Sequence, residues 1–181
     1  ASGKIGFVMY SRVGLPNSTS NMYNAMKDRT PLVIFSDHAE TNREGTESHE
    51  DIDDWLGAVK QYTKWRWVVE QPNRIPEFVR QACKVASVMP GGPTHVRIPR
   101  DVMYRGNVSA TVFAGDAFHI PMELRPDAKE VERAARILLE SQSPLLYCGP
   151  EVSLCHANAA LLELAELLGI PAVQARSFYS D

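Results

Sequence analysis

The sequence lacks the features that identify several large classes of protein. Its three cysteines, Cys83, Cys148 and Cys155, form neither a disulfide framework nor a CxxC zinc motif, because they are odd in number and widely spaced. We therefore expect free thiols and a reducing, cytoplasmic location. No apolar run approaches the roughly 18 residues that a membrane-spanning helix needs, so a membrane is not an expected partner.

Basic residues are also few. Lys and Arg number 19 against 22 Asp and Glu, which gives a net charge of −3 and a pI of about 6.0. Without a basic footprint, nucleic acid is not an expected partner. What the sequence does contain is 44% hydrophobic and 23% charged residues, a composition typical of a globular protein that can bury a core.

Apolar strands alternate with helical patterns along the first hundred residues. Strands are predicted at 3–11, 31–37, 65–71 and 94–102, and helices at 17–29, 55–65 and 75–89. A turn is predicted at 11–21, with Ser18, Thr19 or Ser20 near the N-cap of the first helix. The clearest helix, 75–89, has one apolar stripe, formed by Phe78, Val79, Ala82, Val85, Ala86 and Met89.

The alternation of strands and helices stops at residues 103–125, where we predict a linker, and then restarts. Helices are predicted at 127–141 and 157–168, the second capped by Gly169, and strands at 144–152 and 170–176. Continuously apolar strands that alternate with helices indicate an α/β fold, with parallel sheets flanked by helices on both faces. Neither unit looks complete, because the second offers only about two strands, so we expect a fragment of a longer protein.

Several motifs form an ordered series along the chain. Gly14 and Asn17 form G-x-x-N, which is followed after six residues by N-A-x-x-D-x-x-P-L-V at 24–33, and later by GGPTHVRIPRDV at 91–102. This series resembles the pyrimidine-binding domain of thiamine-diphosphate-dependent enzymes such as acetolactate synthase and benzoylformate decarboxylase. In that family a strand of the form G-P-V-x-[IL]-x-[IVL]-P-x-D-V closes the domain.

The second half resembles the start of the family's Rossmann-like middle domain. Residues 144–149, PLLYCG, fit its strand P-x-[IVL]-[IVL]-x-G, and LGIPAV follows at 168–173. The resemblance implies three parts, namely the C-terminal part of the pyrimidine-binding domain at 1–102, a linker at 103–125, and the N-terminal part of the middle domain at 126–181.

The stretch 43–55, REGTESHEDIDDW, is dense in acidic residues around one histidine. Its acids lack the ligand order of an EF-hand, and taken alone the stretch is typical of a solvated loop. However, GTESHED at 45–51 resembles the family's G-T-D-A-F-Q-E loop, which borders cofactor and substrate. The resemblance implies that His49 and Glu50 border the substrate and relay protons, which is work that an imidazole can do near neutral pH. An exposed charge run remains the alternative.

The resemblance implies a thiamine-diphosphate-dependent lyase or transferase that decarboxylates a 2-oxo acid or joins it to a second carbonyl compound. Gly14 and Asn17 would shape the pyrimidine side of the cofactor, while the diphosphate and magnesium site would lie outside this chain. FAD, ADP or an empty middle domain are all compatible with the sequence. A homodimer or homotetramer is implied, because pyrimidine and diphosphate domains of different subunits meet in this family.

The chain alone is expected to be inactive, because the family's activating glutamate and its G-D-G…N motif are not in this sequence. Three departures keep a second reading open, that of a non-catalytic or degenerate paralogue that acts as a binding subunit. The family's Gly-Pro-Gly turn reads Arg12-Val13-Gly14, and Tyr10 stands where one branch has a catalytic histidine. The Gly-Gln step after the second strand reads Asp37-His38, and His38 is expected at the surface.

Overall fold

A computed structural model describes residues 4–46, 52–115 and 125–174, which form two compact units. The units comprise Ala1–Ile120 and Pro121–Asp181. In the first unit the strands are β1 (Gly6–Tyr10), β2 (Leu32–His38), β3 (Trp65–Val68) and β4 (Pro93–Pro99). Its helices are α1 (Gly14–Asn17), α2 (Thr19–Lys27), α3 (Trp55–Ala58), α4 (Ile75–Ser87) and α5 (Arg100–Met103), with short 3-10 turns η1 (Thr41–Arg43), η2 (Lys60–Tyr62) and η3 (Pro72–Arg74).

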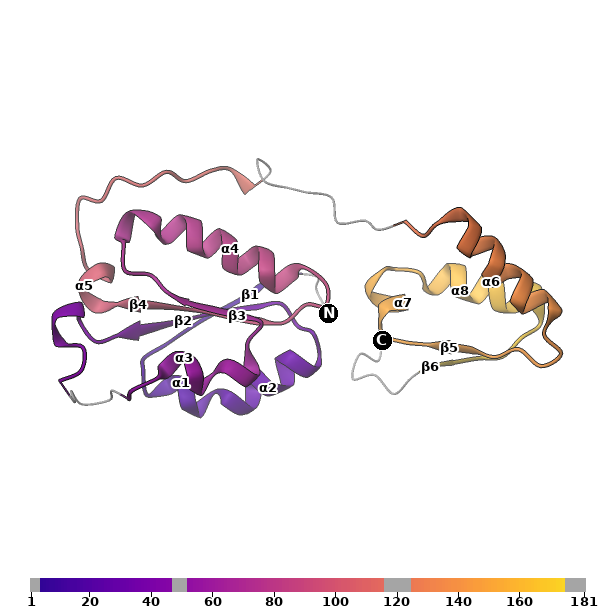
Figure 1. The fold of residues 1–181 in the computed structure, drawn as a ribbon, viewed down its shortest axis with the longest axis horizontal. Coiled ribbons are helices and arrows are strands. Elements are labelled where there is room, and N and C mark those ends of the chain that lie inside the picture. Colours follow the sequence, from indigo (N-terminus) through magenta and orange to yellow (C-terminus); the bar gives the residue numbers. More distant parts are fainter. Residues whose placement is uncertain (1–3, 47–51, 116–124, 175–181) are drawn as a thin grey trace. The chain divides into compact units, whose positions relative to one another are not determined.

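The four strands form one parallel sheet in the order β1-β2-β4-β3. Helix α4 covers one face of the sheet, and α1, α2 and α3 cover the other (Figure 1). The predicted α/β fold with a covered parallel sheet is therefore confirmed. All strands run the same way, so the loops that follow β1, β2 and β4 leave from one edge, which we call the carboxyl edge.

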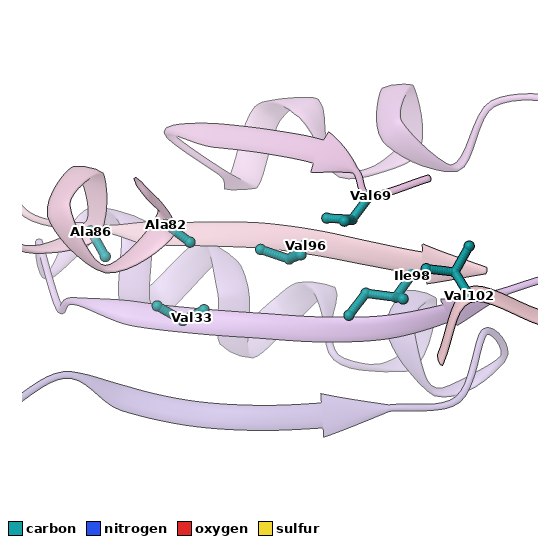
Figure 2. Packing of buried hydrophobic residues seen from close by; sticks show 7 residues of the cluster. All are labelled: Val33, Val69, Ala82, Ala86, Val96, Ile98 and Val102. Atoms are coloured by element: carbon teal, nitrogen blue, oxygen red, sulfur yellow. The ribbon is translucent and has the colours of Figure 1, made fainter. Parts of the chain in front are cut away.

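The face under α4 holds an apolar cluster, shown in Figure 2. Its buried members are Val33, Val69, Ala82, Ala86, Val96, Ile98 and Val102. The predicted stripe of α4 supplies Ala82 and Ala86, with Phe78 packed against them, but its last member is wrong. The helix ends at Ser87, and Met89 is 49% exposed because the chain turns away at Pro90.

The opposite face holds a second cluster under α1, α2 and α3. Its buried members are Leu15, Met22, Ile34, Trp55 and Val59. Two local predictions differ here. Helix α1 already forms within the segment predicted as a turn, and Ser18 donates its hydroxyl hydrogen to Leu15 O at 2.7 Å instead of capping α2 with its side chain. The helix predicted at 55–65 divides into α3 and η2.

The second unit has fewer elements. Its elements are α6 (Ala128–Glu140), β5 (Leu146–Cys148), α7 (Glu151–Leu154), α8 (Asn158–Leu168) and β6 (Ala172–Gln174). Strands β5 and β6 pair in parallel. Gly169 ends α8 with a φ of 62°, as predicted, because the left-handed conformation suits glycine best. All three cysteines are free, and no helix in the described ranges has the length and apolar character that a bilayer span needs.

Lys64 connects the end of α4 to the strand layer. Its ammonium group donates hydrogen bonds to Val85 O at 2.5 Å and Val88 O at 2.7 Å. Val85 lies in the last turn of α4 and Val88 is its C-cap residue, and carbonyls at a helix end have no further helical amide to pair with. Burial lowers the pKa of Lys64. The side chain therefore acts as a C-terminal cap supplied from another part of the sequence.

Replacing Lys64 with Met should lower the free energy of unfolding by about 2 kcal/mol, because two carbonyls at the helix end lose a charged donor. Urea denaturation followed by tryptophan fluorescence measures this change. Lys84→Met is the matched control, since Lys84 is an exposed lysine of the same helix, and it should change the free energy by less than about 0.5 kcal/mol. Equal effects of the two substitutions would contradict the capping role.

Candidate functional site

A cavity of about 560 Å³ lies at the carboxyl edge of the first sheet. It is lined by His38, Glu44, Gly45, Ile52, Asp53, Asp54, Trp55, Leu56, Val68 and Arg97. These residues come from the carboxyl-terminal parts of β2, β3 and β4, from the acidic loop between β2 and α3, and from the start of α3. Open parallel α/β sheets bind ligands outside the carboxyl ends of their strands, so the position suits a ligand site.

The wall of the cavity nearest the sheet is basic and aromatic. His38, Trp55 and Arg97 are only 7%, 4% and 4% exposed. The guanidinium of Arg97 lies 5.3 Å from the centroid of the Trp55 ring, within the range of a cation–π contact. This arrangement holds a cationic group at a fixed place in the wall.

The rim of the cavity is acidic and exposed. Glu44 Oε1 lies 3.3 Å from His38 Nε2, and Asp54 Oδ1 accepts a hydrogen bond from Gly57 N at 2.7 Å as the N-cap of α3. Asp53 is also exposed. Glu44 and Asp54 of the acidic stretch therefore have defined partners, while all three carboxylates stay exposed to solvent.

The entry to the acidic loop is a tight turn. Thr46 Oγ1 donates to Arg43 O at 2.7 Å, and Gly45 has a φ of 76°, which a side chain would strain. The two residues predicted to be catalytic, His49 and Glu50, follow this turn but lie outside the described residues. The structure thus places the start and the end of their loop at the cavity, and the roles of both residues stay a prediction.

Gly14 and Asn17, predicted to bind the cofactor, begin and end α1 just beyond β1. Gly14 is half-buried and Asn17 is exposed. A Cβ at position 14 would lie 3.3 Å from Tyr10 Cβ, so the turn brings its backbone close to the end of β1. Both residues lie at the carboxyl edge, but neither is among the described residues that line the cavity. Their role in binding stays a prediction.

Sequence reasoning missed part of this site. The expectation that His38 lies at the surface is wrong, because β2 continues through His38, which pairs in register with Pro99 of β4 and is nearly buried. Arg97 was also missed, although a charged residue within an otherwise apolar central strand was a usable signal. The described residues contain no group of three side chains that could hold a metal ion.

The carboxylate of Asp101 also orders the carboxyl edge of the first sheet. Asp101 of α5 accepts hydrogen bonds from Thr41 Oγ1 at 2.6 Å and from Thr41 N at 3.0 Å, and these bonds lower the pKa of Asp101. The two residues are 60 positions apart in the sequence. The contact fixes η1, which leads into the acidic loop, against the end of β4.

A buried histidine lies within the sheet, away from the residues that line the cavity. His95 of β4 is fully buried, and its Nε2 lies 2.8 Å from Ser36 Oγ on β2. Burial lowers the pKa of His95 to about 3, with smaller contributions from the positive charges of Arg97 and Arg66. The folded protein therefore keeps this imidazole neutral over the physiological pH range.

This shift predicts a pH dependence of stability. The pKa of His95 is lower in the folded state than the ordinary value of about 6.5 in the unfolded chain, so the unfolded state takes up a proton first as the pH falls. Between pH 6 and pH 4 this histidine alone should lower the free energy of unfolding by about 1.4 kcal/mol per pH unit. His95→Gln, which keeps an amide to pair with Ser36, should show a slope that is shallower by about this amount in urea titrations.

If His95→Gln does not fold, NMR titration of the wild-type imidazole replaces it. Protonation of the His95 ring near pH 6 in the folded protein would contradict the prediction.

The fold is similar to that of solved thiamine-diphosphate-dependent enzymes. A solved structure from Mycobacterium smegmatis, described as that of a putative thiamin diphosphate-dependent enzyme, matches with a TM-score of 0.85 and 25% identity, over 97% of this chain and 33% of that one. A 4-hydroxybenzoylformate decarboxylase from Rhodococcus jostii, also thiamine diphosphate-dependent, shares the fold, with a TM-score of 0.83 and 22% identity, over 96% and 33%.

Sequence relatives are more specific. The chain is 29% identical over 181 residues to a Methanocaldococcus jannaschii protein named probable acetolactate synthase large subunit, a match to 94% of this chain and 29% of that protein. It is 28% identical over 176 residues to the acetolactate synthase large subunit of Corynebacterium glutamicum, covering 95% and 28%. No family model matches the chain.

The resemblance to thiamine-diphosphate-dependent enzymes is thereby confirmed. The chain is a homologue of acetolactate synthase large subunits over nearly its whole length, and it spans about three tenths of the length of the curated relatives that it matches.

Proposed function

We propose that this chain is part of a thiamine-diphosphate-dependent enzyme that decarboxylates a 2-oxo acid or joins it to a second carbonyl compound. In this proposal residues 1–102 supply the C-terminal part of the pyrimidine-binding domain, 103–125 the linker, and 126–181 the start of the middle domain. The observation that carries it is the ordered match to acetolactate synthase large subunits over 94% of the chain. The chain by itself would be inactive.

The first sheet supports this proposal through its carboxyl edge. The turn that carries Gly14 and Asn17 and the loop that leads to His49 and Glu50 both leave from that edge. A half-buried glycine backbone and an exposed amide fit a flat heterocycle that carries hydrogen-bonding groups. When bound, thiamine diphosphate accepts the electron pair that is released as carbon dioxide leaves the substrate.

The residues of this chain would then divide the work. Gly14 lets the backbone approach the pyrimidine side of the cofactor, and Asn17 donates or accepts hydrogen bonds there. His49 and Glu50 border the 2-oxo acid, and His49 holds or passes a proton at its imidazole. Arg97, held in the cavity wall beside Trp55, adds positive charge next to that region.

Other parts of the proposal lie beyond this chain. Magnesium and the diphosphate would be held by residues outside it, in a homodimer or homotetramer located in the cytoplasm. The middle domain, of which β5 and β6 would form the start, is the part of the proposed enzyme that could bind FAD.

A non-catalytic paralogue is the second candidate, and one observation favours it. Positions 12 and 37, where the family pattern has glycines, carry Arg12 and Asp37, and these residues are bonded to each other at the edge where the cofactor would bind. The protein that carries this chain, expressed with its native flanking sequence, would in that case bind a partner subunit without binding thiamine diphosphate. Calorimetric titration with thiamine diphosphate and magnesium separates the two candidates.

His49→Ala in that longer protein tests the catalytic assignment. We expect the turnover of a 2-oxo acid, followed as carbon dioxide release from pyruvate and benzoylformate, to fall about 100-fold, because a positioned proton donor typically contributes 10²–10⁴-fold. The dissociation constant for thiamine diphosphate should stay within about threefold, since the imidazole is assigned to the substrate. His156→Asn, which changes an exposed histidine of the second unit, should leave turnover unchanged. Full activity of His49→Ala would refute the assignment.

A further inference from the structure

Asp37 links three segments at the carboxyl edge. Its Oδ1 accepts a hydrogen bond from the backbone amide of Arg12 at 2.8 Å, and its Oδ2 accepts one from Nε of Arg100 at 2.7 Å. The side chains of Asp37 and Arg12 are 13% and 7% exposed, so the carboxylate is largely shielded from water. The guanidinium Nε of Arg12 also lies 4.0 Å from Oδ2.

The three residues lie at the carboxyl ends of three neighbouring strands, because β2 pairs with β1 on one side and with β4 on the other. Arg12 comes after β1, Asp37 is the second-last residue of β2, and Arg100 begins α5 directly after β4. A hydrogen bond from a backbone amide to a carboxylate is charge-assisted and roughly twice as strong as a neutral one. The carboxylate therefore fixes the backbone after β1 relative to the ends of β2 and β4.

The backbone after Arg12 continues directly into α1. Gly14 N donates to Ser11 O at 2.9 Å, which closes a turn around Arg12. Within the described residues α1 has no side-chain cap of its own, since Val13 stands at its N-cap. The structure shows a side-chain acceptor for the Arg12 amide of this turn in Asp37, 25 positions away in the sequence.

Arg12 and Asp37 stand at two separate departures from the family pattern, and the structure joins them into one interaction. Neither position has a positive φ, so this turn does not need the conformational freedom of glycine at either place. Charge-assisted hydrogen bonds hold the turn that glycines would otherwise shape.

The geometry points to Asp37 as a positioning residue: its carboxylate, acting through the Arg12 amide, sets the turn that carries Gly14 and Asn17. The effect on the turn stands independently of the proposed function, whereas the effect on thiamine diphosphate rests on it. Asp101 offers a matched comparison, because it makes the same kind of bond to the Thr41 amide at the same edge.

Amide hydrogen exchange measured by NMR on residues 1–181 tests the first part. In Asp37→Ala the Arg12 amide should exchange about tenfold faster or more, and the Thr41 amide should keep its wild-type rate. Asp101→Ala should produce the reverse pattern. Asp37→Asn, which keeps one carbonyl acceptor, should give an intermediate rate at Arg12. An unchanged Arg12 rate in Asp37→Ala, or equal acceleration at both amides in either variant, overturns the inference.

If Asp37→Ala does not fold, Arg100→Gln takes its place. It removes the second anchor of the carboxylate and should accelerate exchange at Arg12 by a smaller factor, while Thr41 stays unchanged. An unchanged Arg12 rate in Arg100→Gln overturns the three-segment link.

Thiamine diphosphate titration of the longer protein tests the second part. Asp37→Ala should raise the dissociation constant about tenfold, and Asp37→Asn should recover part of it. If the wild type binds thiamine diphosphate and Asp37→Ala binds it with the same dissociation constant, the link between the turn and the cofactor is overturned. A wild-type protein that binds no thiamine diphosphate refutes the proposed function instead, and the exchange rates still decide the role of Asp37.

Discussion

The burial of β4 is the constraint on which the rest of the first unit depends. All seven of its residues, Pro93–Pro99, are buried, because the strand lies between β2 and β3 in the sheet and between helices on its two faces. Its neighbours β2 and β3 pair with it in parallel, and parallel strands are joined by crossover connections whose helices cover the faces of the sheet. That arrangement brings the ends of separate strands to one edge, where the chain carries its charged and polar side chains.

This central strand carries polar groups as well as apolar ones, and a partner lowers the cost of burying each of them. Thr94 donates to Ala82 O at 3.2 Å, His95 pairs with Ser36, and Arg97 lies over Trp55. Each of these contacts joins β4 to a different part of the sequence. The polar residues thereby specify which elements pack on the strand, while Val96 and Ile98 of the same strand belong to the apolar cluster of Figure 2.

Periodicity predicted the elements well and their ends less well. The alternation of apolar strands and helices was enough for the parallel sheet, and the Gly169 cap followed from local chemistry alone. The end of α4 was misplaced at Met89, since the apolar pattern continues past the point where packing ends. The burial of His38 could not be read from the sequence, because it depends on β4 extending beside β2 as far as Pro99.

The site shows the same division between local pattern and tertiary contact. Gly14, Asn17, His49 and Glu50 came from a family resemblance, which supplies positions along the chain without contacts in space. The pairing of Arg12 with Asp37, and of Thr41 with Asp101, joins residues 25 and 60 positions apart. Such contacts leave no periodic signal in the sequence. A single sequence therefore shows that a residue is unusual at its position, but it does not show which distant residue pairs with it.

The division into two units has a consequence for spectroscopy. Each unit has its own sheet, and the three tryptophans, Trp55, Trp65 and Trp67, all belong to the first. Tryptophan emission therefore reports the state of one sheet and is silent about the other. Tyr147 on β5, which is 72% exposed, offers a weaker probe of the second unit. A denaturation curve recorded by fluorescence alone would look like a single transition even if residues 125–174 had melted earlier.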